Sequence, residues 1–240
     1  MMAKEAKSSL VYSVFQNISE GYDRKNDLIS LGMQRGWKKM LTGSLIEWLP
    51  GKGKMLDVCC GTGDIGIAVA DSRPDVQVTS ADFSPAMLEV ARRKAGTLRN
   101  ISFYEADAME LPWEDGAFNA SAVSFGLRNT ADYLKVLQEM ARVTAPGGRV
   151  MCLDSFVPKA PLVLPFYRLY FMHLMPALAG GWKHRKEYRW LSESTDRFIS
   201  PDELAGLFAQ AGLVNVKRKS RLFGACVLLC GKKPRERQSE

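Results

Sequence analysis

A glycine-rich turn between a buried strand and a helix constrains the fold of this chain more than any other feature. Residues 55–64 read MLDVCCGTGD, an apolar strand followed by Gly61-Thr62-Gly63 and then by an apolar run typical of a helix. Glycine suits such a turn because it adopts positive φ and lets a ligand approach the bare backbone. The pattern therefore predicts a ligand site at the end of this strand.

Two aspartates flank the turn and bear on the charge of that ligand. Asp57 ends the strand, and Asp64 stands where the helix should begin. A helix N-terminus that binds a dinucleotide pyrophosphate should carry no other anion. Two carboxylates instead suit a ligand with an ammonium and a sulfonium, such as S-adenosylmethionine (SAM). The alternative is that both aspartates only cap secondary structure.

Composition narrows the class of protein. A chain of 240 residues that is 46% hydrophobic can form one sizeable α/β domain, residues 1–240, with a small appended lobe. The net charge of +7 is spread along the chain, which favours a solvated basic face over a nucleic-acid groove. The five cysteines lack the spacing of a metal site, and no signal peptide begins the chain. We therefore expect a cytoplasmic protein without a metal or a nucleic-acid partner.

Strand and helix patterns alternate after the turn. Residues 1–30 are too polar to fold alone and are expected to form a lid, and residues 36–49 form a helix. Strands are expected at 55–58, 76–81, 101–104, 118–125 and 150–154, with two closing strands at 213–219 and 222–230. Helices are expected after residues 64, 84, 132 and 200. A turn is expected at 145–149 and a charged tail at 232–240. This alternation predicts a doubly wound, mainly parallel sheet.

Polar residues recur where the expected strands end. Asp82 follows Gly63 by 19 residues, the spacing at which a Rossmann-type second strand presents an acid to ribose hydroxyls. Asp107 follows the third strand, where it could reach an adenine amino group or be a loop residue. Ligands of such sheets bind at the carboxyl ends of the strands. Gly61–Asp64, Asp82, Asp107, residues 124–129 and Asp154 are all expected there.

The most apolar region, residues 160–179, admits two interpretations. Pro161, Pro165 and Pro176, together with Arg168 and His173, argue against a membrane span. The region could pack in the core. It could also cover a lipophilic acceptor and touch a bilayer surface, and the two interpretations are compatible.

These residues together resemble one family, the SAM-dependent C-methyltransferases of quinone biosynthesis, which act on demethylmenaquinone and ubiquinone precursors. The resemblance covers nearly the whole chain, and Cys59-Cys60 is similar to the menaquinone branch. It is carried by Tyr22-Asp23 with Asn26-Asp27, Leu56-Asp57 with residues 61–64, Asp82-Phe83-Ser84, Ala106-Asp107-Ala108, Ser124 to Asn129, Pro146 to Arg149, and Tyr188 to Leu191 with Glu193-Ser194. Asp154 stands where the family usually has glutamate.

The resemblance implies a class I SAM-methyltransferase sheet of seven strands, mostly parallel with the last antiparallel, and a helical insertion at 156–195 over the acceptor site. It implies methylation of a prenylated quinol ring carbon, foremost demethylmenaquinol. A ubiquinone precursor, another lipophilic acceptor and, more distantly, an NAD-binding oxidoreductase are the alternatives. SAM contacts are expected at Gly61, Thr62, Gly63, Asp82, Phe83, Asp107, Ala108 and Ser124. A homodimer and a peripheral contact with the inner face of the membrane are left open.

Carbon methylation of a hydroquinone needs a stabilised phenolate, and this need suggests catalytic residues. We expect Arg128 to provide the positive charge, and Asn129 and Tyr22 to orient the ring oxygen. Asp154 or His173 could receive the proton. In the alternative interpretations Arg128 only pairs with Asp132, Tyr22 packs in the lid, and His173 is a core residue.

Overall fold

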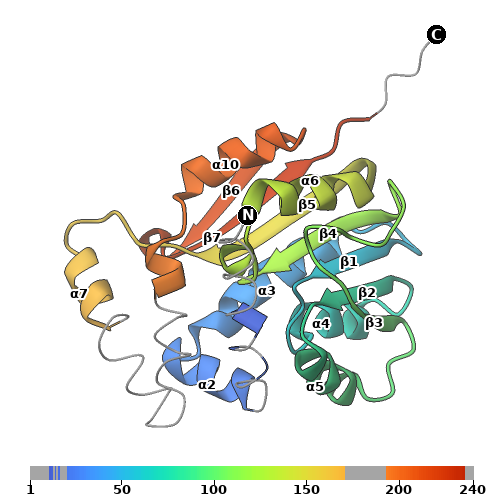
Figure 1. Cartoon of the computed structure of the whole chain (residues 1–240), viewed down its shortest axis with the longest axis horizontal. Helices are drawn as coiled ribbons and strands as arrows, with labels where there is room; N and C mark the ends of the chain where they lie inside the picture. The colour runs from blue at the N-terminus through green and yellow to red at the C-terminus, as the bar shows by residue number, and fades with distance from the viewer. Residues whose placement is uncertain (1–10, 13, 15, 17–20, 171–192, 236–240) are drawn as a thin grey trace.

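A seven-stranded sheet forms the centre of the computed structural model, which describes residues 11, 12, 14, 16, 21–170 and 193–235 (Figure 1). The strand order is β3-β2-β1-β4-β5-β7-β6. The strands are β1 (Lys54–Val58), β2 (Gln77–Asp82), β3 (Ile101–Glu105), β4 (Phe118–Ser124), β5 (Thr144–Ser155), β6 (Val214–Arg221) and β7 (Cys226–Lys232). The order runs outward from β1 in both directions, so the sheet has its switch point between β1 and β4.

The pairing directions confirm the expected sheet. β1 pairs in parallel with β2 and β4, β2 with β3, and β4 with β5. β7 lies between β5 and β6 and is antiparallel to both. The carboxyl ends of β1, β2 and β4 therefore meet at one edge of the sheet, and this edge carries the predicted ligand residues.

Helices cover both faces of the sheet. They are α2 (Tyr22–Ile29), α3 (Met33–Trp48), α4 (Asp64–Ser72), α5 (Pro85–Ala95), α6 (Tyr133–Val143), α7 (Leu164–Arg168) and α10 (Pro201–Gln210), with 3-10 turns η1 (Leu127–Asn129) and η3 (Leu222–Gly224). Within the described residues, no helix has the length and apolar character that would be needed to cross a membrane.

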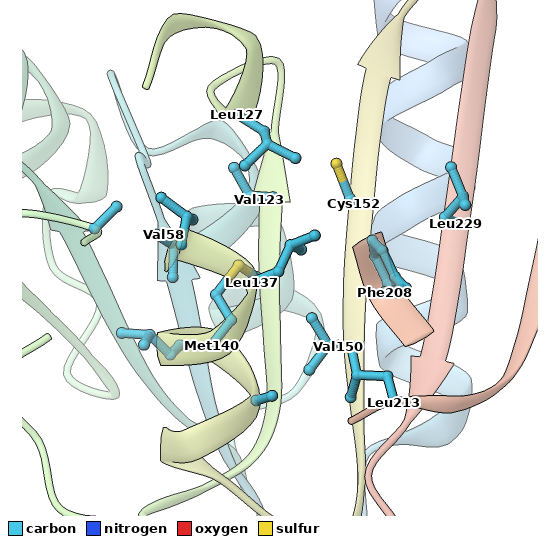
Figure 2. Close-up of a cluster of buried hydrophobic side chains, with 14 of the residues drawn as sticks. Val58, Val123, Leu127, Leu137, Met140, Val150, Cys152, Phe208, Leu213 and Leu229 are labelled. Carbon is cyan, nitrogen blue, oxygen red and sulfur yellow. The ribbon is translucent and has the colours of Figure 1, made fainter. Parts of the chain in front are cut away.

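Two apolar layers hold the sheet between these helices. On one face, Leu137 and Met140 of α6 and Phe208 of α10 pack on the strands (Figure 2). On the other face, α3 and α4 contribute Leu41 and Val69. Each such fully buried side chain stabilises the fold by about 1.5–3 kcal/mol. Because both faces are covered, the central strands are apolar on both sides, as their sequences predict.

Three predicted helix starts are confirmed by their caps. Ser84 accepts a hydrogen bond from the Met87 amide, and Asp132 accepts one from the Lys135 amide. Ser200 forms a capping box with Glu203 at the start of α10. These side chains satisfy amide groups that a helix start leaves without partners, which is why serine and aspartate mark the three positions in the sequence.

Three expected boundaries were wrong. The predicted turn at 145–149 is a bulge inside β5, where the pairing jumps from Phe118–Thr144 to Ala120–Arg149. Residues 222–224 form η3 rather than strand because Leu222 and Phe223 have positive φ. Lys232 is the last residue of β7 rather than the first of a tail.

Parts of both expected covers lie outside the described residues. In the lid, 1–30, the described part includes α2, which packs beside α3. In the insertion, 156–195, the described part includes α7. Residues 171–192, with His173 and Tyr188 to Leu191, lie outside the described residues, as does most of the tail.

Candidate active site

A cavity of about 240 Å³ lies at the carboxyl ends of the central strands. Its lining comes from the glycine-rich turn, from the ends of β1, β2 and β4, and from α2 and α3. Most of the predicted site residues line it: Tyr22, Gly61, Thr62, Asp82, Phe83, Asp107, Ala108, Ser124, Arg128 and Asn129. Residues predicted from separate parts of the sequence therefore share one cavity.

The glycine-rich turn has the geometry that its sequence predicts. Gly61 and Gly63 have φ of 54° and 82°, and Gly63 is the N-cap of α4. A Cβ on Gly66 would lie 2.3 Å from Ser80 Oγ, so only glycine lets α4 pack this closely on β2. Gly63 itself is not among the lining residues, and its role is to shape the turn.

Asp57 and Asp82 are buried carboxylates at the ends of β1 and β2. Asp57 Oδ2 accepts a hydrogen bond from the Gly66 amide at 3.0 Å. Asp82 accepts from the Gly61 and Ser84 amides at 2.8 and 2.9 Å. Burial raises the pKa of Asp57 to about 7 and that of Asp82 to about 6. A cationic ligand would offset this cost of burying charge, and free lone pairs on Asp82 could accept ribose hydroxyls.

Asp64 lines the cavity, as expected, and is paired with two lysines. It begins α4 but makes no capping hydrogen bond. Its carboxylate pairs instead with Lys38 of α3 at 2.5 Å and with Lys94 of α5. Burial would raise the pKa of Asp64, but the two lysines outweigh it and lower the pKa. The negative charge at this end of the cavity therefore comes mainly from Asp57 and Asp82.

Thr62 ties the turn to α2. Its hydroxyl donates to Asp23 Oδ1 at 2.6 Å and accepts from Lys94 Nζ at 3.1 Å. Lys94 Nζ also lies 2.5 Å from Asp23 Oδ2. The predicted ligand residue Thr62 thus bonds to α2 of the predicted lid, and this contact holds the turn and α2 together.

Three more predicted ligand residues line the cavity. Asp107 is exposed, and its Oδ1 accepts from the Met109 amide at 2.8 Å. Phe83 packs against Tyr12, with ring centroids 5.7 Å apart. Ser124 Oγ is buried and, within the described part of the chain, has no hydrogen-bond partner. A buried hydroxyl in this position is suited to bind a polar group of a ligand.

Arg128 forms a buried ion pair with Asp154, whereas the alternative interpretation of its role had paired it with Asp132. The Arg128 side chain is 10% exposed and that of Asp154 is fully buried. Burial raises the pKa of Asp154 although Arg128 opposes the shift. Arg128 lines the cavity and Asp154 is not among the lining residues. Asp154 therefore holds Arg128 in place from behind, and the idea that it takes a proton directly from a substrate loses support.

Asn129 and Tyr22 also line the cavity, and the charge of Arg128 acts on the Tyr22 phenol. Asn129 donates through Nδ2 to the Phe125 carbonyl at 3.4 Å, and its buried Oδ1 has no partner among the described residues. Burial raises the pKa of Tyr22 above its ordinary value, so its phenol is neutral at physiological pH. These two groups can accept from and donate to an oxygen of a bound substrate.

Two strained turns separate the acidic residues from Arg128. Cys59 and Phe125 follow β1 and β4, and both have positive φ, of 52° and 57°. A Cβ on Gly126 would lie 2.5 Å from Cys59 Cβ, so the two turns are packed against each other. Such strain in non-glycine residues is typical of functional sites.

Sequence reasoning missed the contribution of α3. Gln34, Trp37 and Lys38 of this helix line the cavity. They continue the face that buries Leu41 and Leu45, at helical spacing. The available signal was Lys38, a lysine on the apolar face of a predicted helix. Such a residue needs an anionic partner, and the structure shows that this partner is Asp64.

No group of three metal-ligating side chains occurs in the ranges that the structure describes. The buried carboxylates Asp57 and Asp82 accept hydrogen bonds from backbone amides, which stabilise their charged form.

Comparisons with known proteins agree with this site. The ubiE/COQ5 methyltransferase family matches residues 1–233. Demethylmenaquinone methyltransferase of Staphylococcus aureus is 41% identical over 239 residues, 98% of each chain. Two solved SAM-dependent methyltransferases share the fold. That of Thermotoga maritima has a TM-score of 0.62 at 18% identity and covers 93% of this chain and 99% of its own. That of Aquifex aeolicus has a TM-score of 0.57 at 16% identity and covers 80% of this chain and 88% of its own.

The family match spans nearly all of the chain, and the relative is similar along almost its whole length. The fold is the one shared by the two solved methyltransferases. The chain therefore belongs to the ubiE/COQ5 methyltransferase family and is a SAM-dependent methyltransferase.

Proposed function

We propose that this enzyme methylates a ring carbon of demethylmenaquinol, with SAM as the methyl donor. The similarity to the Staphylococcus aureus enzyme supports this acceptor. The single observation that carries the proposal is that one cavity is lined from two sides, an acidic end with Asp57 and Asp82 from β1 and β2 and another end with Arg128 and Asn129 from η1, after β4. The two ends suit a cationic donor and a phenolic acceptor respectively.

The acidic end would hold the donor. SAM supplies a methyl group on a sulfonium, which is a strong leaving group. Asp82 would accept hydrogen bonds from the ribose hydroxyls, since its oxygens have lone pairs beyond those used by two amides. Asp107, Phe83 and Ala108 would contact the adenine, and Ser124 Oγ would bond a further polar group of the donor.

The other end would hold and activate the acceptor. A quinol carbon becomes nucleophilic when an adjacent hydroxyl gives its proton to solvent and charge moves onto the ring. The carbon then takes the methyl group as the methyl–sulfur bond of the sulfonium breaks and leaves a neutral thioether, and the carbon loses its own hydrogen as a proton, which restores the aromatic ring. Arg128 would stabilise the resulting oxyanion, and Asp154 would keep the guanidinium aimed at it. Asn129 Oδ1 and the Tyr22 hydroxyl would orient the ring oxygens. The chain would thus align the carbon with the methyl group and exclude water.

Product analysis tests the proposal. The protein is incubated with methyl-labelled SAM and either reduced demethylmenaquinone or a reduced ubiquinone precursor, and the labelled quinone is identified. We expect label in menaquinone at a rate well above that for the benzoquinol. Equal or greater labelling of the benzoquinol would move the acceptor assignment to the ubiquinone branch, and no label in either would refute quinol methylation.

Calorimetry separates donor binding from transfer. We expect SAM and S-adenosylhomocysteine to bind, and NADH not to bind, because the acidic residues beside the turn disfavour a pyrophosphate. Tight NADH binding would instead support the oxidoreductase alternative.

A further inference from the structure

Exposed apolar side chains gather at the edge of the sheet that holds the cavity. Among the described residues, Phe166 is 74% exposed and Phe223 is 71% exposed. Most of the large exposed hydrophobic side chains come from three segments, and we call them the apolar rim: Leu28, Leu31, Leu162, Phe166, Leu169, Leu222 and Phe223. Single exposed apolar residues are ordinary, but a gathering of them marks an interaction surface.

The three segments are joined by hydrogen bonds. The Phe156 amide, just after β5, donates to the Ala225 carbonyl, just after η3, at 2.9 Å. The Tyr170 hydroxyl, after α7, donates to the Ile29 carbonyl at 2.7 Å. Ile29 lines the cavity. The rim therefore lies beside the cavity, and α7 and α2 occupy the same side of the molecule (Figure 1).

Positive charge flanks two of the three rim segments, whereas the third segment, at the end of α2, follows Asp23 and Asp27 as well as Arg24 and Lys25. Residues 155–170 and 213–235 contain no aspartate or glutamate, and their exposed cations include Arg168, Lys219 and Arg221. Leu222 and Phe223, next to Arg221, both have positive φ, which strains the backbone at an exposed apolar tip. Apolar tips surrounded by lysine and arginine are the composition that binds the interface of an anionic bilayer.

We propose that the apolar rim docks this enzyme on the surface of an anionic lipid bilayer. The inference rests on the proposed function, because a prenylated quinol is dissolved in the bilayer and docking would bring the cavity to it. A second copy of the chain fits the surface less well, since a two-fold contact would bring the same cations face to face.

Vesicle flotation tests the rim itself. The full chain is mixed with vesicles of phosphatidylglycerol and phosphatidylcholine in equal parts, or of phosphatidylcholine alone. We expect binding to the anionic vesicles, weakened by salt. The affinity of the Phe166→Ser/Phe223→Ser variant for these vesicles should be lower by about tenfold or more. Tyr104→Ser, which removes an exposed aromatic from β3 at the other side of the sheet, should bind normally.

A matched pair of variants tests how much the positive charge beside the rim contributes to vesicle binding. Lys219→Gln/Arg221→Gln should weaken binding to anionic vesicles about tenfold or more, while binding to phosphatidylcholine alone should change little. Lys52→Gln/Lys54→Gln, at the amino end of β1, removes the same charge away from the rim and should have a smaller effect. Equal losses in both variants would overturn the proposal, because binding would then follow net charge alone.

Activity assays distinguish this inference from the proposed function. The Phe166→Ser/Phe223→Ser variant should methylate a quinol without a prenyl tail at the normal rate, and a long-chain quinol in anionic vesicles more slowly. Unchanged vesicle binding, or a dimer in sedimentation that this variant dissociates, would overturn docking. Rim-dependent vesicle binding without methylation of either quinol would support docking and refute the proposed function.

Discussion

The two ends of the cavity hold their charged groups by different means. At the acidic end, Asp57 and Asp82 accept hydrogen bonds from the backbone of the glycine-rich turn and of α4 and α5. At the other end, Arg128 is held by a second side chain, Asp154, which comes from β5. Backbone contacts follow from local geometry, whereas a side-chain pair depends on both partners. We therefore expect the acidic end to tolerate single substitutions better.

The largest effect should come from Arg128→Ala. Loss of the cation that stabilises the phenolate should slow turnover about a hundredfold or more, while the SAM dissociation constant changes little. The measurement is kcat with saturating SAM, beside calorimetry of SAM binding.

This variant also leaves Asp154 buried without its partner, which costs about 3–5 kcal/mol of stability. Arg128→Ala/Asp154→Ala removes that penalty and serves as the control. It should regain most of the thermal stability and stay inactive. Recovery of activity in the double variant would show that Arg128 is only structural.

Asp82→Asn should weaken SAM binding about ten- to a hundredfold, because it removes a charge and a hydrogen-bond acceptor for the ribose. Turnover at saturating SAM should fall much less than in Arg128→Ala. Asp71→Asn, at an exposed aspartate of α4, is the matched control and should bind SAM normally. A loss confined to kcat would contradict a role in donor binding.

Gly126→Ala tests the contact between the two ends. The new Cβ would meet Cys59, and such overpacking costs about 1–3 kcal/mol, measurable as a lower unfolding temperature. Cys59→Gly/Gly126→Ala removes the clash, and glycine suits the positive φ at residue 59, so stability should return.

The control for this prediction is Gly43→Ala in α3. The new Cβ meets no atom within 4 Å and should stabilise the chain by about 0.5–1 kcal/mol. Equal stabilities for Gly126→Ala and Gly43→Ala would show that the turns are loosely packed.

The smallest effect should be that of pH on donor binding. Because the pKa values of Asp57 and Asp82 are raised to about 7 and 6, both carboxylates gain protons between pH 8 and 5.5. As the pH falls from 8 to 5.5, the loss of these negative charges should lower the affinity for the cationic SAM by about five- to tenfold.

Stability of the unliganded enzyme should change in the opposite sense. A raised pKa means that the folded state binds protons more tightly than the unfolded chain, so the stabilisation present at low pH is lost as pH rises through about 7. Asp57→Asn should therefore raise the unfolding temperature more at pH 8 than at pH 5. A pH-independent difference would show that Asp57 is not the group responsible.

Local patterns were enough to predict the acidic end. The glycine-rich turn, the strand-end position of Asp82 and the start of α5 depend on residues near in sequence, so spacing reveals them, whereas the structure chose Asp132 over Thr130 as the cap of α6. A sheet of seven strands with an antiparallel last strand followed from the resemblance, and the structure confirms both features. Patterns of this kind do not show which side chains from distant segments meet.

What the sequence by itself determined was the sheet, the turn and the set of residues gathered at one edge, because hydrophobic period and backbone geometry are local properties. Only the tertiary structure decided the charge partners. It paired Arg128 with Asp154, and it joined Asp64 to Lys38 and Lys94. It also turned residues 145–149 into a bulge. The physical reason is that ion pairs and strand register are selected by which surfaces become buried together, and that depends on the packing of the whole chain.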